Sequence, residues 1–93
     1  MDRAQEFDFV WGLLDAGASF LDATVRVQLC VKIGAGDYRD SIVELLQRFS
    51  TVDAAIPPRL APSLWAWVNG FMGSDSETFL HTLASRIRIS NAS

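Results

Sequence analysis

The stretch TVRVQLCVKI, residues 24–33, decides the fold class of this 93-residue chain. Apolar and polar residues alternate along it, which is the pattern of a half-buried β-strand. On a helix, its small and apolar residues and those just before it instead form one stripe: Phe20, Ala23, Thr24, Val27, Cys30 and Val31. A lone strand has no partner for its backbone hydrogen bonds, and we find no second convincing strand. We therefore predict a helix, or else a strand that pairs across a dimer.

Side chains near the start of this segment also favour a helix. Ser19 is followed three residues later by Asp22, which is close to the capping-box pattern. Asp22 precedes Arg26 by one helical turn, the favourable order for an ion pair. The glycines at 34 and 36 then end the predicted helix.

A first helix is predicted over Arg3–Ala16, with Asp2 as its cap and Gly17 as its end. One row of apolar residues at helical spacing shares a face of this helix: Phe7, Val10, Trp11 and Leu14. A second row is formed by Phe9, Leu13 and Ala16. A helix with two apolar rows either lies between two neighbours or exposes one row to solvent.

The remaining helices are predicted over residues 37–51, 62–70 and 74–89, with a proline-containing linker at 52–58. Each has apolar residues at helical spacing, and short loops join them. The predicted fold class is all-α: a compact bundle of about four to five short helices. It forms a single domain, residues 1–93, with residues 90–93 frayed.

Composition and charge restrict the partners of the chain. Hydrophobic residues make up 49% of it and charged residues 20%, which is more apolar side chain than a small body can readily hide. We expect part of this surplus at the surface, covered by a protein partner or a second copy. The net charge is −3 and no basic run occurs, so nucleic acid is an unfavoured partner. No apolar stretch approaches the ~20 residues of a membrane span.

Catalytic and metal-binding signals are weak. The chain has one cysteine, Cys30, predicted to be buried, and one histidine, His81, which are too few for a metal site. The turn Gly34-Ala35-Gly36 lacks the third glycine of a dinucleotide-binding loop. We predict no enzyme activity, no cofactor and no metal. With no secretion signal visible at the start of the sequence, the predicted location is the cytoplasm.

The segment 56–72 is the most informative for function. If Leu64, Trp67, Val68 and Phe71 face inward, Trp65 points about a hundred degrees away, on the side of Asn69 and Met72. Tryptophan and methionine are enriched at interfaces. The predicted partner-binding patch therefore consists of Trp65, Met72, Asn69, Phe9 and Leu13. The alternative is that Trp65 packs into the core on the row of Phe9.

These features predict a small protein-interaction module: an adaptor, an inhibitor of the antitoxin type, or a subunit of an assembly. It would bind a protein partner or itself through an apolar aromatic patch. The alternative function is a helix-turn-helix DNA-binding regulator. In that case the last helix would present Arg86, Arg88 and His81 to the duplex.

Overall fold

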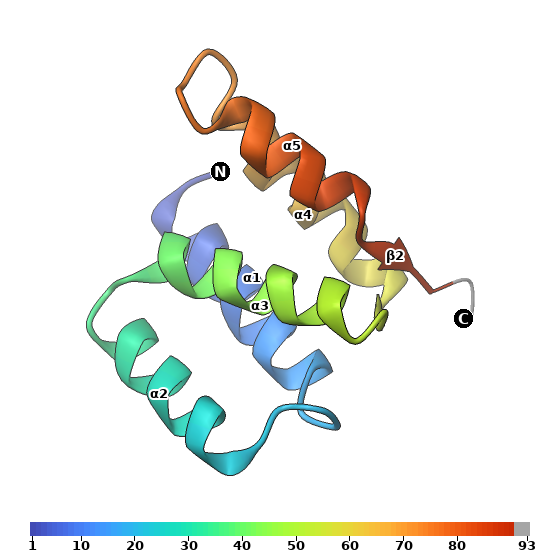
Figure 1. The fold of residues 1–93 in the computed structure, drawn as a ribbon. Coiled ribbons are helices and arrows are strands. Elements are labelled where there is room, and N and C mark those ends of the chain that lie inside the picture. Colours follow the sequence, from blue (N-terminus) through green and yellow to red (C-terminus); the bar gives the residue numbers. More distant parts are fainter. Residues whose placement is uncertain (91–93) are drawn as a thin grey trace.

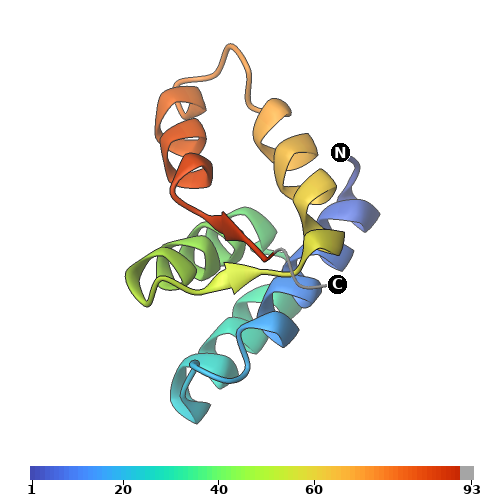
Figure 2. The same ribbon diagram turned by 90° about the vertical axis from the view of Figure 1, so that its right-hand side faces the viewer.

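A computed structural model describes residues 1–90 and shows a helical bundle (Figure 1, Figure 2). Its five α-helices are α1 (Arg3–Ala16), α2 (Ala23–Gly34), α3 (Tyr38–Thr51), α4 (Ala61–Asn69) and α5 (Glu77–Ser85). A short 3-10 helix, η1 (Pro58–Leu60), and two short strands, β1 (Ala55–Ile56) and β2 (Arg88–Ile89), complete the described part. The Cα radius of gyration is 12.4 Å, close to the ~12 Å of a compact chain of this length. The prediction of a small all-α bundle is confirmed.

Helix α3 occupies the middle of the bundle and packs against α1, α2 and α5. Helices α4 and α5 form an antiparallel pair on one side, and α2 lies at the opposite edge (Figure 1, Figure 2). One apolar core joins all five helices and β1. Its fully buried large side chains are Trp67, Phe9, Phe49, Leu13, Leu29, Ile33, Ile42, Leu45, Leu46, Ile56, Leu64 and Leu80.

Helix α1 begins with a capping box, in which Asp2 Oδ1 accepts from Gln5 N and Gln5 Oε1 accepts from Asp2 N. Its buried side takes residues from both of the apolar rows seen in the sequence. Phe9, Val10, Leu13 and Leu14 are buried, whereas Phe7 and Trp11 are 41% and 38% exposed. The cause is the place of α1 between α3 and α4, because the row of Phe9 is covered by Trp67 of α4, with ring centroids 6.3 Å apart.

The segment 24–33 is helical, as predicted. Asp22 is the N-cap of α2, and its Oδ1 accepts a hydrogen bond of 2.8 Å from Val25 N. Leu29 and Ile33 face the core. The prediction that Cys30 is buried is wrong, because Cys30 follows Leu29 around the helix and points to solvent.

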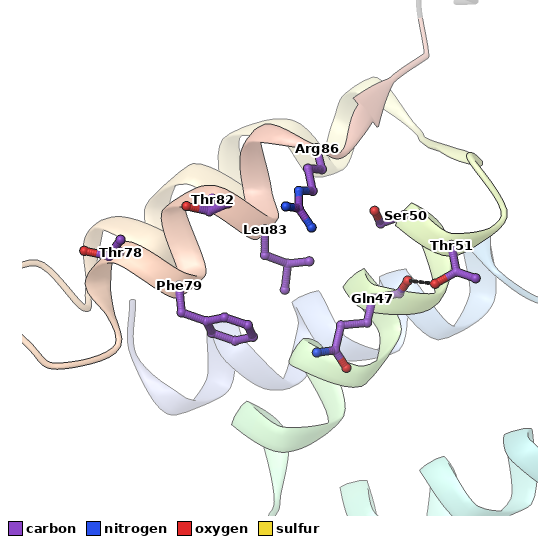
Figure 3. Close-up of a pocket in the computed structure, with 8 residues that line it drawn as sticks. All are labelled: Gln47, Ser50, Thr51, Thr78, Phe79, Thr82, Leu83 and Arg86. Carbon is purple, nitrogen blue, oxygen red and sulfur yellow. Dashed lines mark hydrogen bonds between the residues drawn. The ribbon is translucent and has the colours of Figure 1, made fainter.

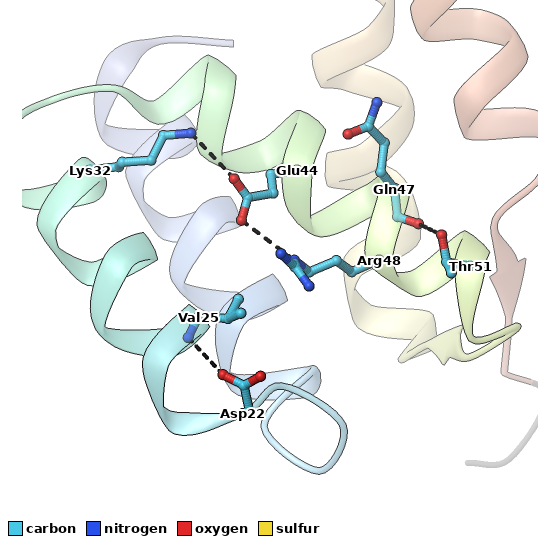
Figure 4. A network of polar contacts seen from close by, with 7 residues as sticks. All are labelled: Asp22, Val25, Lys32, Glu44, Gln47, Arg48 and Thr51. Carbon is cyan, nitrogen blue, oxygen red and sulfur yellow. Dashed lines mark hydrogen bonds and ion pairs between the residues drawn. The ribbon is translucent and has the colours of Figure 1, made fainter.

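One ion pair ties α2 to α3, and a second pair within α3 shares the same carboxylate (Figure 4). Lys32 Nζ lies 3.5 Å from Glu44 Oε1, and Arg48 Nε lies 3.4 Å from Glu44 Oε2. All three side chains are partly exposed, so each pair adds at most ~1 kcal/mol. Only the Lys32–Glu44 pair contacts α2, and the buried side chains of Leu29 and Ile33 supply most of the attachment of that helix.

The C-terminal region is shorter in helix than predicted. Helix α5 ends at Ser85, not near Ile89, because Arg88–Ile89 pairs in parallel with Ala55–Ile56. Ser90 N also donates to the carbonyl oxygen of Ile56 at 2.9 Å, so fraying does not begin at residue 90. Residues 91–93 lie outside the described residues. This pairing joins the segment after α5 to the segment that carries the buried side chain of Ile56.

The turn between α2 and α3 depends on Gly36, whose φ is +90°. A Cβ there would lie 2.6 Å from Nη2 of Arg3, which donates to the carbonyl oxygen of Gly36 at 3.1 Å. We expect Gly36→Ala to lower the free energy of unfolding by ~1–2 kcal/mol, measured from urea denaturation midpoints. Gly34→Ala is the matched control, because a Cβ at Gly34 meets nothing within 4 Å. Equal losses in the two variants would contradict this prediction.

Candidate interaction surfaces

Three of the five predicted partner-binding residues are exposed at the surface. Trp65, Asn69 and Met72 occupy one side of α4 and the turn that follows it, and we call this group the α4 face. Trp65 is 39% exposed and Met72 is 69% exposed. Leu64, Trp67 and Val68 are buried on the opposite side of the same helix.

The α4 face is bordered by α5. The indole ring of Trp65 lies 5.8 Å from the imidazole ring of His81, measured between centroids, with 58° between the planes. Trp65 is therefore a surface residue that packs against His81. It does not belong to the core, which was the alternative that the sequence left open.

The other two predicted residues do not contribute to this face. Phe9 and Leu13 are 2% and 0% exposed, so the prediction that they belong to the patch is wrong. The sequence could not distinguish the two apolar rows of α1, because both have helical spacing. In the structure the exposed row carries Phe7 and Trp11, whose rings meet edge to face at 6.1 Å.

This row contributes to an aromatic cluster that the sequence analysis did not predict. Phe7 also contacts Tyr38 at the start of α3, with ring centroids 5.7 Å apart. The guanidinium carbon of Arg3 lies 4.4 Å from the centre of the Tyr38 ring. These contacts hold the α2–α3 turn against α1. The i, i+4 spacing of Phe7 and Trp11 signals such a pair.

A second exposed apolar surface lies on α2. Ala23, Val27, Cys30 and Val31 point away from the side chains that α2 buries, and we call this group the α2 face. Val27 is 63% exposed and Val31 is 67% exposed. These residues belong to the stripe seen in the sequence, and the strand-like alternation arose because α2 carries apolar residues on both its inner and outer sides.

A groove of about 560 Å³ separates α3 from α5 (Figure 3). Its lining consists of Gln47, Ser50, Thr51, Thr78, Phe79, Thr82, Leu83 and Arg86. Phe79 and Leu83 turn toward α3, and the guanidinium of Arg86 points toward Ser50 (Figure 3). Thr51 Oγ1 donates to the carbonyl oxygen of Gln47 at 2.9 Å. The hydroxyl, amide and guanidinium groups of the lining can form hydrogen bonds with a ligand. Among residues 1–90, those that line this groove include no carboxylate, histidine or cysteine, so the groove offers no acid–base pair.

The residues predicted for DNA binding do not share a surface. Arg86 lines the groove beside α3, whereas His81 lies against Trp65 on the other side of α5. Arg88 belongs to β2 and not to a helix, and its Nη1 is 3.0 Å from Oδ2 of Asp53. A recognition helix presents its polar side chains to one groove of the duplex, and these three residues do not have that arrangement.

Within residues 1–90, no three His, Cys, Asp or Glu side chains come close enough together to hold a metal ion. None of their helices combines the length and the apolar character needed to cross a membrane. Comparison with known proteins gives no match to a family model, a curated protein or a solved structure. Function must therefore be inferred from the exposed surfaces themselves.

Proposed function

We propose that this chain is a small protein-interaction module that binds a protein partner through the α4 face. The supporting observation is that Trp65 on α4 and Met72 in the turn that follows it are both exposed. Large apolar side chains grouped in this way on a small domain are typical of an interface. An adaptor, an inhibitor of the antitoxin type and an assembly subunit would all use such a face.

The α4 face has the composition of an interface centre. Tryptophan and methionine are among the residues enriched there, and tryptophan is frequent among residues that dominate binding energy. Asn69, exposed between them along the helix, offers an amide that both donates and accepts. The net charge of −3 favours a partner with a basic rim around its own apolar patch.

Met72 is held in place by the turn that carries it. Glu77 Oε2 accepts from the N–H of Gly73 at 3.1 Å, and Ser74 Oγ donates to the carbonyl oxygen of Phe71 at 2.6 Å. The guanidinium of Arg39 lies 4.8 Å from the centre of the Phe71 ring. A side chain on an ordered turn loses less entropy on binding than one on a free loop. These bonds therefore support Met72 as a ready contact point.

The proposal is for a non-catalytic protein of the cytoplasm that needs neither a cofactor nor nucleic acid. A single unpaired cysteine, Cys30, suits a reducing compartment, where no disulfide has to form. The proposal depends on the α4 face and is unaffected by where the chain acts.

Removing the two apolar side chains of the α4 face is expected to abolish partner capture. In a quantitative pull-down from a lysate of the native host, the Trp65→Ala/Met72→Ala variant should lose at least ~10-fold of the specifically enriched protein, because ~1.4 kcal/mol suffices for that factor. Val52→Ala is the matched control, since Val52 is 51% exposed but lies beyond the end of α3. It should capture the partner as wild type does.

Stability measurements on the same variants separate binding from folding. Trp65→Ala should shift the thermal midpoint by only a few degrees, because ~1 kcal/mol corresponds to roughly 4–8 °C in a domain of this size. The proposed function is wrong if wild type enriches no protein, or if the double variant enriches the same protein equally well.

A further inference from the structure

The groove between α3 and α5 carries hydroxyl groups that the rest of the described chain does not use (Figure 3). The hydroxyls of Ser41 and Ser85 each donate to the carbonyl oxygen one helical turn earlier, as serines in helices often do. Ser50 and Thr82 line the groove, and their hydroxyls form no hydrogen bond within residues 1–90. Both hydroxyls are therefore available to a ligand in the groove.

Arg86 brings a positive charge to the same groove, and its guanidinium forms no hydrogen bond or ion pair within residues 1–90. Arg88, two residues later, is by contrast paired with Asp53, with 3.0 Å between Nη1 and Oδ2. The guanidinium of Arg86 instead points across the groove toward Ser50 (Figure 3). An anion placed between these two side chains can accept hydrogen bonds from both.

The wall of the groove beside Arg86 is apolar. Phe79 and Leu83 lie one helical turn apart on α5, and both side chains turn toward α3 (Figure 3). Phe79 is 51% exposed although it lines a hollow, so about half of its surface is left for a ligand to cover. The groove volume of about 560 Å³ falls in the ~300–1,000 Å³ range of small-molecule sites. The groove therefore combines an anion-binding end with an apolar wall.

The charge of the ligand is limited by the two helices. Ser50 and Arg86 lie at the C-terminal ends of α3 and α5, where the helix dipoles disfavour an anion by roughly 2- to 5-fold each. Charge-assisted hydrogen bonds from a guanidinium favour an anion by ~10- to 100-fold, which outweighs either dipole. One negative charge is thus accepted, whereas the charge of about −2 on a phosphate is disfavoured.

We propose that this groove binds a small organic carboxylate, with the carboxylate between Arg86 and Ser50 and an apolar body on Phe79 and Leu83. A peptide is a poorer occupant, because the lining comes from two helices whose backbone groups are already hydrogen-bonded. Since the lining offers no acid–base pair, the ligand is bound and not converted. A carboxylate of about twelve non-hydrogen atoms should dissociate at roughly 0.2–2 mM.

The test uses 4-phenylbutyrate, which joins one aromatic ring to one carboxylate. Two-dimensional ¹H–¹⁵N NMR of the wild-type chain, titrated to about 20 mM at constant ionic strength, should show saturable shifts. The largest shifts are expected within residues 47–51 and 78–86, which include the lining of the groove. The neutral 4-phenylbutanamide should bind at least ~10-fold more weakly, because it lacks the charge that Arg86 recognises. Inorganic phosphate should also bind more weakly than 4-phenylbutyrate.

Substitutions separate the charged end from the apolar wall. Arg86→Gln keeps a polar side chain and should weaken 4-phenylbutyrate binding by at least ~10-fold. Arg59→Gln is the matched control, because Arg59 is exposed on η1 and does not line the groove, and it should bind as wild type does. Phe79→Ala should weaken binding by ~3- to 10-fold through the lost apolar contact. Both Arg86 and Phe79 are exposed, so these variants should keep the dispersed NMR spectrum of the folded chain.

The groove and the α4 face are tested independently. Arg86→Gln should leave partner capture unchanged, and Met72→Ala should leave 4-phenylbutyrate binding unchanged, because Met72 lies outside the groove lining. The proposal is overturned if wild type shows no saturable shifts, or if the shifts map away from α3 and α5. It is also overturned if Arg86→Gln binds 4-phenylbutyrate as wild type does, or if the amide or phosphate binds equally well.

Discussion

Trp67→Ala is expected to lower the free energy of unfolding by ~3–5 kcal/mol, the range for removing a buried tryptophan. Trp67 is 2% exposed, and its ring centroid lies 6.3 Å from that of Phe9 and 5.1 Å from that of Phe71. Its Nε1 donates to Glu6 Oε2 at 2.8 Å, across the contact between α4 and α1. The total free energy of unfolding of a 93-residue domain is only ~5–14 kcal/mol, so this substitution removes a large part of it. The thermal midpoint should fall by on the order of 12–40 °C.

The control is Trp65→Ala, the same chemical change two positions earlier. Trp65 is 39% exposed, so its truncation leaves no closed cavity and should cost ~1 kcal/mol or less. Trp67→Phe isolates the polar contribution, because it keeps a ring but removes the donor to Glu6, and should cost ~1–2 kcal/mol beyond the change in volume. Similar midpoints for Trp65→Ala and Trp67→Ala would contradict the assignment of the two tryptophans.

The assignment of these tryptophans shows what the sequence can determine. The spacing of Leu64, Trp67 and Val68 fixes the inner side of α4, and the structure buries these three residues. Trp65, Asn69 and Met72 are exposed in the structure, whereas the sequence left open whether Trp65 packs into the core. A helix with a single apolar stripe has only one orientation that hides it, so local spacing is sufficient.

Helix α1 shows where local spacing is insufficient. Both of its apolar rows satisfy the helical pattern, and only the position of Trp67, about sixty residues later in the chain, decides between them. Cys30 illustrates the same limit in α2, where Leu29 and Ile33 outcompete the stripe on the other side. The exposure of Phe9 and Leu13 was therefore predicted wrongly, because it depends on how α1 and α4 pack together and not on either helix alone.

The end of α5 was mispredicted for a different reason. Leu80, Leu83 and Ile87 continue the helical pattern toward Ile89, and no glycine or proline interrupts it. Pairing with Ala55–Ile56 gives residues 88–89 backbone partners that the helix would otherwise supply. Such a two-residue pairing has no sequence pattern of its own, so tertiary contact decided this boundary.

Phe49→Ala is expected to be the second most destabilising of these changes, again by ~3–5 kcal/mol. Phe49 is 1% exposed, and its ring meets that of Phe20 edge to face, with centroids 4.9 Å apart and planes at 87°. Phe20 lies in the connection between α1 and α2, so this contact fixes the position from which α2 starts. Urea denaturation should show the loss, and Phe79→Ala, at a 51% exposed phenylalanine, should change the midpoint little.

A double-mutant cycle with Phe20→Ala measures the part that belongs to the pair. The coupling free energy should be ~0.5–1.5 kcal/mol, because the edge-to-face contact contributes beyond the area that each ring buries. Since the pair positions α2 and lies away from α4, Phe20→Ala should leave partner capture through the α4 face unchanged while the fold persists. A coupling near zero would mean that Phe20 covers Phe49 only as bulk apolar surface, and that Leu29 and Ile33 position α2 without it.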